Sequence, residues 1–383
     1  MDILKKFDVQ VCMVSAQPLP NLMPILSCPP KTVFLLVTDR MKDKAGVLAH
    51  IIKRRTQTEV IQIPVGNGEF EDVETGLLDI LEKVVGKSMI TNVTGGTKLM
   101  AFAAMNFSDN SFYVTTDNQV YLFGRDFGNG QKAVLPADTK ISIEDFLYVH
   151  GVDVISPMPV RNIRQQWLPF AEQVAKSPML AAATRTLNAV IAQAAGKNKQ
   201  ALSAHLDYAP DRDLKQLLNI AEDCELVSVT GAELVFPSVE ARDYLHGIWF
   251  EEYVFGVVKS LEGVQDCAMS VQIDLLSKEH GRRHELDVVF LADNTLFVIE
   301  CKTRNYLSEK ISSDERNTTI YKLDTLGDLG GLKTRKGFAS LYELASSMRE
   351  RAKGSKIQVW EKNDIQGLKK HLQNWIKQAR NEI

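Results

Sequence analysis

The chain has 383 residues, of which 45% are hydrophobic and 24% are charged, as is usual for globular proteins. No apolar run approaches the roughly 20 residues that span a bilayer, and the N-terminus lacks the layout of a signal peptide, so we expect no membrane partner. The net charge of −3 gives by itself no indication of nucleic-acid binding.

Cysteine usage and the distribution of charge are more informative. The 5 cysteines are scattered and show no Cys-x-x-Cys spacing. This argues against a disulfide framework and a structural zinc site, and favours a reducing, cytoplasmic location. Residues 331–383 carry 12 lysines and arginines but 5 acidic residues, a net charge of +7, so the rest of the chain carries −10. This basic segment could face a polyanion, although a solvated helix face is the more common meaning.

Residues 1–125 alternate strand and helix patterns, which predicts a doubly wound parallel sheet in an N-terminal domain over 1–150. Ligands of such sheets bind at the carboxyl ends of the strands. The expected strands are 9–14, 32–37, 60–65 and 88–93, with helices to about 55, over 72–85 and over 97–105, and a hairpin over 111–123.

One strand end stands out, because Asn92-Val93 runs into Thr94-Gly95-Gly96-Thr97-Lys98. Glycines let the backbone approach a ligand closely, and a helix that begins here offers free N–H groups to a phosphate. The string is neither a dinucleotide fingerprint nor a phosphate-binding loop of the ATPase type, so it does not favour NAD or ATP. The alternative is a tight strand-to-helix turn whose glycines serve packing only.

The middle of the chain, 151–240, is expected to be a separate connector. Residues 136–159 have the character of a connection, and short helices follow, such as 179–194 and 214–222. A hairpin over 225–236, turning at Gly231, closes the segment, so the order resembles a winged helix. Because no helix here is strongly basic, a spacer that joins or dimerises domains is favoured over nucleic-acid contact.

A long helix is predicted over 242–260. Its apolar stripe contains one acid, Glu251, whereas Glu252 falls on the face of Gly256 and Lys259. An acid on a core-facing stripe is costly unless it is paired or binds a metal, so Glu251 is a candidate site residue. The alternative is that Glu251 lies at the edge of the stripe and reaches water.

Two apolar strands, 285–290 and 295–302, are expected to form a hairpin at Asp293-Asn294. That turn pairs 292 with 295 and, by the same count, Asp287 with Glu300, with Cβ atoms roughly 5 Å apart. Lys302 projects from the same face as Glu300. A divalent cation is the simplest reason for facing carboxylates, although a Glu-x-Lys triplet on a solvated strand often means nothing. After Lys302 the chain is polar to 317, and helices are expected from 332 to the end.

Taken together, these motifs resemble a known family. A helix with Glu251, a strand with Asp287, and a strand with Glu300-Cys301-Lys302 are similar to the restriction-endonuclease-like, or PD-(D/E)XK, nuclease core. The string over 92–100 resembles the ligand motif of CRISPR-associated Rossmann-fold (CARF) domains. The whole chain resembles CARF nucleases activated by cyclic oligoadenylate, with the nuclease domain over 241–383. Asp287 follows His284-Glu285-Leu286, which departs from the literal Pro-Asp of that core.

The resemblance implies an α/β homodimer that binds cyclic tetra-adenylate at the interface of its Rossmann-like CARF domains. Binding would activate a metal-dependent nuclease for single-stranded RNA or DNA. The ligand contacts implied by the motif are Ser15 and Gln17 in the first loop and Thr94, Gly95, Gly96, Thr97 and Lys98 at the fourth strand.

In the implied mechanism, Asp287, Glu300 and the backbone carbonyl of Cys301 bind Mg²⁺ or Mn²⁺. Lys302 orients the attacking water, and Glu251, with Glu252 as the alternative, completes the site. The Cys301 side chain is expected to face the core. A second hypothesis is a nucleotide-sensing, DNA-binding regulator with an inactive nuclease fold, and a third is a dinucleotide-dependent enzyme. RNA or DNA preference, the ring size of the ligand and its degradation stay open.

Overall fold

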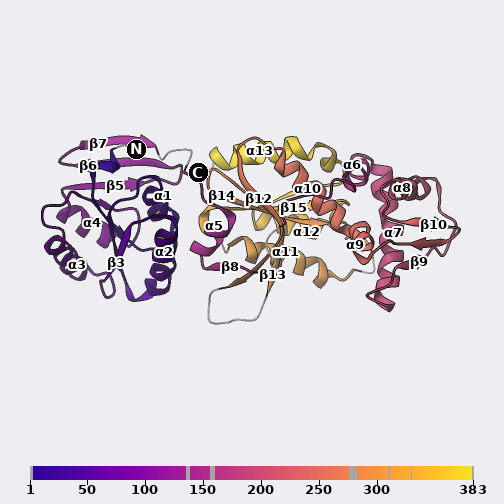
Figure 1. Ribbon diagram of the computed structural model, residues 1–383, viewed down its shortest axis with the longest axis horizontal. Coiled ribbons are helices and arrows are strands. Elements are labelled where there is room, and N and C mark those ends of the chain that lie inside the picture. The colour runs from indigo at the N-terminus through magenta and orange to yellow at the C-terminus, as the bar shows by residue number, and fades with distance from the viewer. Residues whose placement is uncertain are drawn as a thin grey trace.

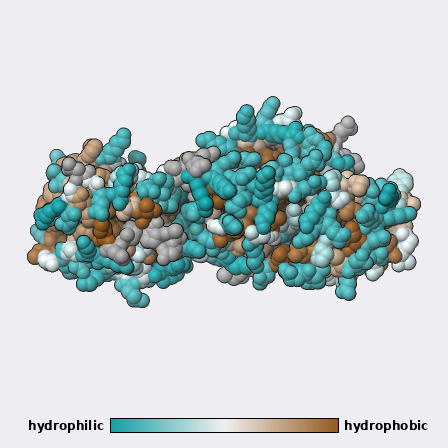
Figure 2. Space-filling view, turned by 90° about the horizontal axis from the view of Figure 1, so that it is seen from above, coloured by the Kyte–Doolittle hydropathy of each residue, from teal (hydrophilic) through white to brown (hydrophobic). Residues whose placement is uncertain are grey.

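Two large sheets and a small one organise the chain, seen here in a computed structural model (Figure 1). The structure describes residues 3–134, 139–155, 160–275, 283–308, 311–328 and 330–381. The molecule is elongated, and it narrows between the N-terminal lobe and the larger body, whose visible face is mostly hydrophilic (Figure 2). No helix in the described residues combines the length and apolar composition that crossing a bilayer requires.

The N-terminal sheet confirms the doubly wound prediction. Its order is β3-β2-β1-β4-β5-β6-β7, with the first five strands parallel and the last two antiparallel. The seventh strand, β7, was not predicted. The strands are β1 (Val9–Met13), β2 (Thr32–Val37), β3 (Glu59–Pro64), β4 (Met89–Asn92), β5 (Asn110–Val114), β6 (Gln119–Gly124) and β7 (Gly128–Val134).

Helices cover both faces of this sheet because its strands are apolar on both sides. In β2, Val33 and Leu35 pack in the cluster of α1 and α2, whereas Phe34 and Leu36 pack in that of α3 and α4. Figure 1 shows α1 and α2 on the side toward the rest of the chain. The helices are α1 (Leu19–Ser27), α2 (Lys42–Arg55), α3 (Phe70–Lys83) and α4 (Lys98–Phe107).

The predicted connection over 136–159 contains a helix, α5 (Ile143–Val149), and a strand, β8 (Val152–Val154). β8 pairs with β12 (Val264–Leu275), so it belongs to the C-terminal sheet and not to the connector predicted from 151 onward. A strand of three residues with one buried side chain leaves no apolar pattern in the sequence, which explains the difference. Residues 135–138 and 156–159 lie outside the described part of the chain.

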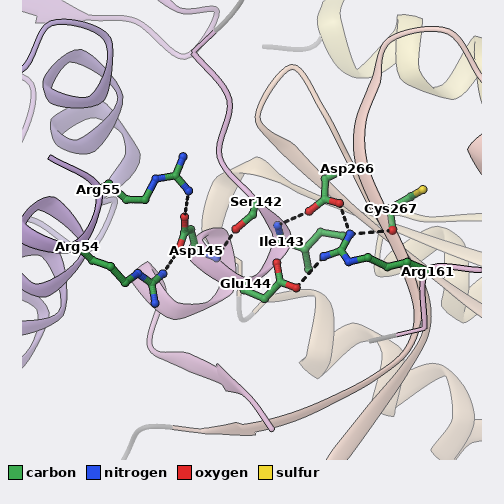
Figure 3. Close-up of polar contacts among 9 residues, drawn as sticks. All are labelled: Arg54, Arg55, Ser142, Ile143, Glu144, Asp145, Arg161, Asp266 and Cys267. Atoms are coloured by element: carbon green, nitrogen blue, oxygen red, sulfur yellow. Dashed lines mark hydrogen bonds and ion pairs between the residues drawn. The ribbon is translucent and has the colours of Figure 1, made fainter. Parts of the chain in front are cut away.

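Polar contacts of α5 tie the two lobes together (Figure 3). The buried Asp145 pairs with Arg54 and Arg55 at the end of α2, the latter at 2.5 Å. Its neighbour Glu144 lies 2.7 Å from Arg161, whose guanidinium also pairs with an aspartate of β12. A hydrophobic cluster continues from α2 through α5 into the C-terminal sheet, so the N-terminal and C-terminal lobes share one core.

The middle segment contains the predicted hairpin, which turns at Gly231 with φ +65°. β9 joins this hairpin as a third antiparallel strand, and one helix, α8, lies between β9 and β10. The hairpin of β10 and β11 thus resembles the wing of a winged helix, and β9 pairs with it. Its elements are α6 (Leu168–Lys176), α7 (Pro178–Lys197), β9 (Ser203–His205), α8 (Arg212–Asp223), β10 (Ser228–Thr230) and β11 (Glu233–Val235).

The C-terminal sheet has the order β16-β15-β14-β13-β12-β8. Strands β16, β15 and β14 are parallel to one another, whereas β14, β13, β12 and β8 pair in antiparallel fashion. The expectation of helices alone after 332 is wrong, because β15 and β16 lie there. β15 begins Thr-Arg-Lys-Gly, and these charged residues do not predict a buried strand. β12 was not predicted either, because polar and apolar residues are mixed along it. The strands are β12 (Val264–Leu275), β13 (His284–Ala292), β14 (Thr295–Lys302), β15 (Thr334–Ser340) and β16 (Ile357–Glu361).

Helices also enclose this sheet. α10 and α13 pack on the face of Val288 and Phe290, and α11 and α12 pack on the face of Val289 and Leu291. The single helix predicted over 242–260 is broken by a π-helical turn, which separates α9 from α10. The elements are α9 (Val239–Asp243), the π-helical turn (Tyr244–Ile248), α10 (Trp249–Lys259), α11 (Ser313–Asp328), α12 (Ser346–Gly354) and α13 (Leu368–Asn381).

Candidate functional sites in the two domains

The hairpin of β13 and β14 has the predicted turn and register. Asp293 and Asn294 adopt left-handed backbone, with φ of +51° and +54°, and Ala292 pairs with Thr295. The ladder continues to Val288 and Ile299. The next pair, which would place Asp287 opposite Glu300, is not formed, so the strands separate where the first acid lies.

Asp287 lies at an interruption on both sides of its strand. Toward β12, Met269 pairs with Val288 and Val271 with Leu286, while the intervening Ser270 has a φ of +52°. Toward β14, Asp287 Oδ2 accepts the backbone N–H of Cys301 at 2.8 Å in place of a ladder bond. The expected direct pairing of Asp287 with Glu300 is therefore corrected. The Asp287 side chain has taken the place of the backbone partner of Cys301 at the point where the ladder ends.

The Lys302 ammonium joins the groups predicted to bind metal. Its Nζ lies 2.9 Å from Asp287 Oδ2 and 2.7 Å from Glu300 Oε1, and it donates to the Cys301 carbonyl at 3.1 Å. Asp287 and Glu300 are 7% and 3% exposed. Two carboxylates and one carbonyl thus converge on a single positive charge where the ladder between β13 and β14 ends.

The acidic side chains around Lys302 outnumber this single lysine. Burial, and then the Asp287 carboxylate, raise the pKa of Glu300. Burial followed by the charge of Asp287 raises the pKa of Glu251 to about 8. Burial alone would lower the pKa of Lys302, but Asp287 and Glu300 outweigh it and hold the pKa above its ordinary value. One lysine therefore faces three acids, and an added cation would be stabilised.

The structure separates the roles of Glu251 and Glu252. Glu252, 1% exposed, accepts the backbone N–H of Arg164 at 3.3 Å and pairs with the Arg164 guanidinium. Glu251 is half-buried, and its pKa responds to Asp287 and Lys302. The fully buried acid is thus Glu252, contrary to the stripe argument, because the π-helical turn shifts the phase of α10. Of the two, Glu251 is the one whose pKa is affected by the charges of Asp287, Lys302 and Glu300.

The residues present fit a hard divalent ion. Its preferred ligands are carboxylate and carbonyl oxygens, and Asp287, Glu300 and Cys301 supply these around one cation. Within the described ranges, no group of three or more His, Cys, Asp and Glu side chains is close enough to hold a metal ion. The Cys301 thiol is buried in the core, and burial raises its pKa, which fits no nucleophilic role.

In the N-terminal domain, the backbone requires glycines at the end of β4. A Cβ atom on Gly95 would lie 2.0 Å from the Met13 carbonyl oxygen, and Gly96 has a φ of +74°. Thr97 then caps α4 by accepting the N–H of Met100 at 3.2 Å. The turn is close-packed and also leaves Gly96 and Thr97 exposed at the helix N-terminus.

A buried amide pair that the sequence analysis did not single out supports this turn. Asn92 donates to Asn21 Oδ1 at 3.1 Å, and Asn21 donates to the Met13 carbonyl at 2.8 Å. The Thr94 hydroxyl lies 2.6 Å from Asn92 Oδ1, to which it donates, and accepts the N–H of Val114 at 2.8 Å. Thr94 therefore holds the loops together. Polar residues at buried strand ends, such as Asn92, are the pattern that could have revealed the pair.

Two cavities meet at this strand edge. One, of about 470 Å³, is lined by the predicted residues Ser15, Gln17, Thr94 and Gly96. The other, of about 610 Å³, is lined by Ser15, Gly96 and Thr97. Gly95 is buried beneath the loop, and Lys98 is exposed and lines neither cavity. Residues that the motif did not reveal also line the first cavity, among them Tyr113, Asn118, Leu332 and Lys333.

Two family models match the chain, one for each of its large domains. Residues 9–146 match the family model of the Card1 CARF domain, and residues 238–379 match that of the Card1-like endonuclease domain. The chain belongs to the CARF nucleases. No curated protein sequence matches this CARF nuclease.

Solved structures share its architecture over nearly the whole chain. Protein VC1899 from Vibrio cholerae is 23% identical, with a TM-score of 0.82, covering 97% of this chain and 98% of that one. Can2 from Sulfobacillus thermosulfidooxidans, solved in complex with cyclic tetra-adenylate, is 26% identical, with a TM-score of 0.77, covering 98% and 99%. A Type III CRISPR defence DNA nuclease activated by cyclic oligoadenylate is 17% identical, with a TM-score of 0.56, covering 88% of this CARF nuclease and 47% of that chain.

The hypothesis of a DNA-binding regulator gains no support from the middle segment. The helix before the wing, α8, carries Arg212 and Lys215 but also Asp213, Glu222 and Asp223. A recognition helix needs an excess of positive charge to approach DNA phosphates. The complete acid and lysine set of the endonuclease domain also argues against an inactive remnant.

Proposed function

We propose that this CARF nuclease hydrolyses phosphodiester bonds of single-stranded RNA or DNA with Mg²⁺ or Mn²⁺, after cyclic tetra-adenylate binds its sensor domain. The observation that carries the proposal is the Lys302 ammonium held by Asp287, Glu300 and the Cys301 carbonyl. The ligand class is supported by the cavity at the Thr94 to Thr97 turn and by the cyclic tetra-adenylate bound to the Can2 relative.

Each group of the endonuclease site has a chemical role. A Mg²⁺ or Mn²⁺ ion bound by Asp287, Glu300 and the Cys301 carbonyl would activate water and neutralise charge on the phosphate. Lys302 positions the attacking water and offsets the negative charge that develops on the scissile phosphate. Glu251, whose pKa is raised by burial and by the charge of Asp287, would hold a water molecule beside this oxygen set.

A homodimer is proposed through α4. Leu99, Phe102 and Met105 are spaced three residues apart on that helix and are 50%, 63% and 44% exposed. Three large apolar side chains on one helical face are expected to be covered by a partner, and a second copy supplies the same face. The neighbouring α3 adds Leu78, 51% exposed. Covering α4 would bring two copies of the adjoining Gly96 and Thr97 turn together around one ligand.

A cleavage assay tests the function. The protein is incubated with single-stranded RNA and DNA, with and without Mn²⁺, across cyclic oligoadenylates of different ring size. We expect cleavage with cyclic tetra-adenylate and Mn²⁺ together. Glu300→Ala and Lys302→Ala should lose at least about 100-fold in rate while remaining folded and binding the ligand. Undiminished cleavage by either variant would contradict the assignment.

A further inference from the structure

The endonuclease domain reaches into the sensor cavity. The 3₁₀ turn Gly331–Lys333 precedes β15, yet Leu332 and Lys333 line the cavity of about 470 Å³ together with Ser15 and Gln17 of the sensor. The Leu332 N–H donates to Gln17 Oε1 at 3.4 Å, across 315 residues of sequence. Leu332 is 71% exposed, so its side chain contributes to the cavity wall and not to the core.

Lys333 is the charged member of this wall. Among the described residues lining the cavity, the other side chains are neutral at pH 7. The Lys333 ammonium donates to the Asn118 amide oxygen at 2.9 Å, a neutral partner in the β5–β6 turn. Within the described part of the chain no carboxylate forms an ion pair with it. An anion in this cavity would therefore find its positive charge on the endonuclease side.

We propose that Lys333 is a ligand-binding residue that the endonuclease domain contributes to the sensor cavity, where its ammonium binds a phosphodiester group of the cyclic oligoadenylate. This assignment rests on the function proposed above. The ligand chemistry is a phosphodiester anion flanked by a nucleobase. The ammonium supplies the charge, while Tyr113, Leu332 and the neutral polar residues suit a base and its ribose.

The electrostatics of Lys333 fit this role. Burial lowers its pKa to about 8, and the attraction of Asp117 and Asp293 does not restore it, while Arg335 lowers it further. These three groups come from the β5–β6 turn, the β13–β14 turn and β15, the elements around Lys333. A phosphodiester beside the ammonium would raise the pKa, so ligand binding should take up protons near pH 8.

The position of Lys333 also links the ligand to the catalytic strand. β15 begins directly after it, at Thr334, and runs parallel to β14. In that ladder Phe338 is in register with Glu300 and Ser340 with Lys302. A ligand that draws Lys333 away from Asn118 thus acts on the strand next to the two catalytic groups. The same contact that binds the phosphodiester would transmit its presence to the endonuclease site.

Calorimetric titration of the full chain with cyclic tetra-adenylate tests the proposal. The variants are Lys333→Met, Lys333→Arg and, as a matched control, Lys370→Met, since Lys370 is exposed on α13 and lines none of the described cavities. We expect Lys333→Met to weaken binding at least about tenfold and Lys333→Arg to stay close to wild type, because a phosphate contact depends on charge. Lys370→Met should be unchanged.

Proton uptake gives a second readout that a merely structural role would not move. Titrations at pH 8 in buffers of different ionisation enthalpy should show about half a proton taken up per Lys333 in wild type, and none in Lys333→Arg or Lys333→Met. If Lys333→Met binds within twofold of wild type with the same uptake, the assignment of Lys333 is overturned while the proposed function stands. A wild-type protein that binds no cyclic oligoadenylate overturns both.

Discussion

Asp287 Oδ2 accepts the backbone N–H of Cys301 at 2.8 Å, where the ladder between β13 and β14 has ended. The carboxylate is thereby fixed to the backbone between Glu300 and Lys302. Its position relative to these two groups is set by the sheet and not by free side-chain rotation. A site built on strands in this way is preorganised for a cation and a phosphate.

Divalent metal should stabilise the folded protein independently of cleavage. We expect Mn²⁺ at a hundredfold excess over its Kd to raise the free energy of unfolding by about 2.7 kcal/mol, measured by thermal or denaturant unfolding. Asp287→Asn keeps the size and an oxygen that can accept the Cys301 N–H but removes the charge, so it should lose most of this gain. A chelator should abolish cleavage by the wild type. An equal Mn²⁺ effect in Asp287→Asn would contradict the assigned ligands.

The two adjacent glutamates of α10 should respond oppositely to removal. Glu251→Ala relieves the repulsion by Asp287, so we expect unchanged or higher stability and a loss of about 10- to 100-fold in cleavage rate. Glu252→Ala leaves Arg164 without its buried partner, so we expect a loss of about 3 kcal/mol in stability. Unfolding and cleavage measured on both variants decide the matter. A stability loss in Glu251→Ala larger than in Glu252→Ala would reverse the roles.

Local features of the fold could be predicted from the sequence. The Asp293-Asn294 turn fixes its own register, because both residues tolerate left-handed backbone. The Gly95-Gly96 turn is likewise marked by adjacent glycines, and Gly96 has a φ of +74°. The alternation of strand and helix patterns along the chain predicted the doubly wound N-terminal sheet. In these cases the signal lies in residues that are neighbours in the sequence.

Features that depend on distant segments could not be predicted. Nothing near Gln17 indicates that it contacts Leu332, and nothing in β8 shows that it joins β12. β15 is a strand because β14 and β16 flank it, although its first residues are charged. The contact of the Asp287 side chain with the Cys301 N–H likewise joins two different strands. The residues of the candidate site could be proposed from the sequence, whereas the contacts among them could not.

His150 should make the free energy of unfolding decrease as the pH is lowered. Its ring donates from Nδ1 to the Phe146 carbonyl at 2.7 Å, and burial, with a smaller effect of Lys44, lowers its pKa to about 4. The unfolded chain binds this proton below about pH 6.5, and the folded protein binds it only below about pH 4. The stabilisation is therefore complete above pH 6.5 and is lost as pH falls to 4, by about 3 kcal/mol. Denaturant unfolding across this range should show a shallower slope for His150→Gln than for wild type, and parallel slopes would refute the assignment.

Gly95 should tolerate a side chain much less well than Gly46 does. A Cβ atom on Gly95 would lie 2.0 Å from the Met13 carbonyl oxygen, whereas one on Gly46, within α2, meets nothing within 4 Å. We expect Gly95→Ala to lower the free energy of unfolding by at least about 2 kcal/mol, because the backbone must shift, and to weaken ligand binding with it. Gly46→Ala should instead stabilise the helix by roughly 0.5–1 kcal/mol. Unfolding and ligand titration of both variants check this, and equal stability of the two would show that the Gly95 turn tolerates a side chain.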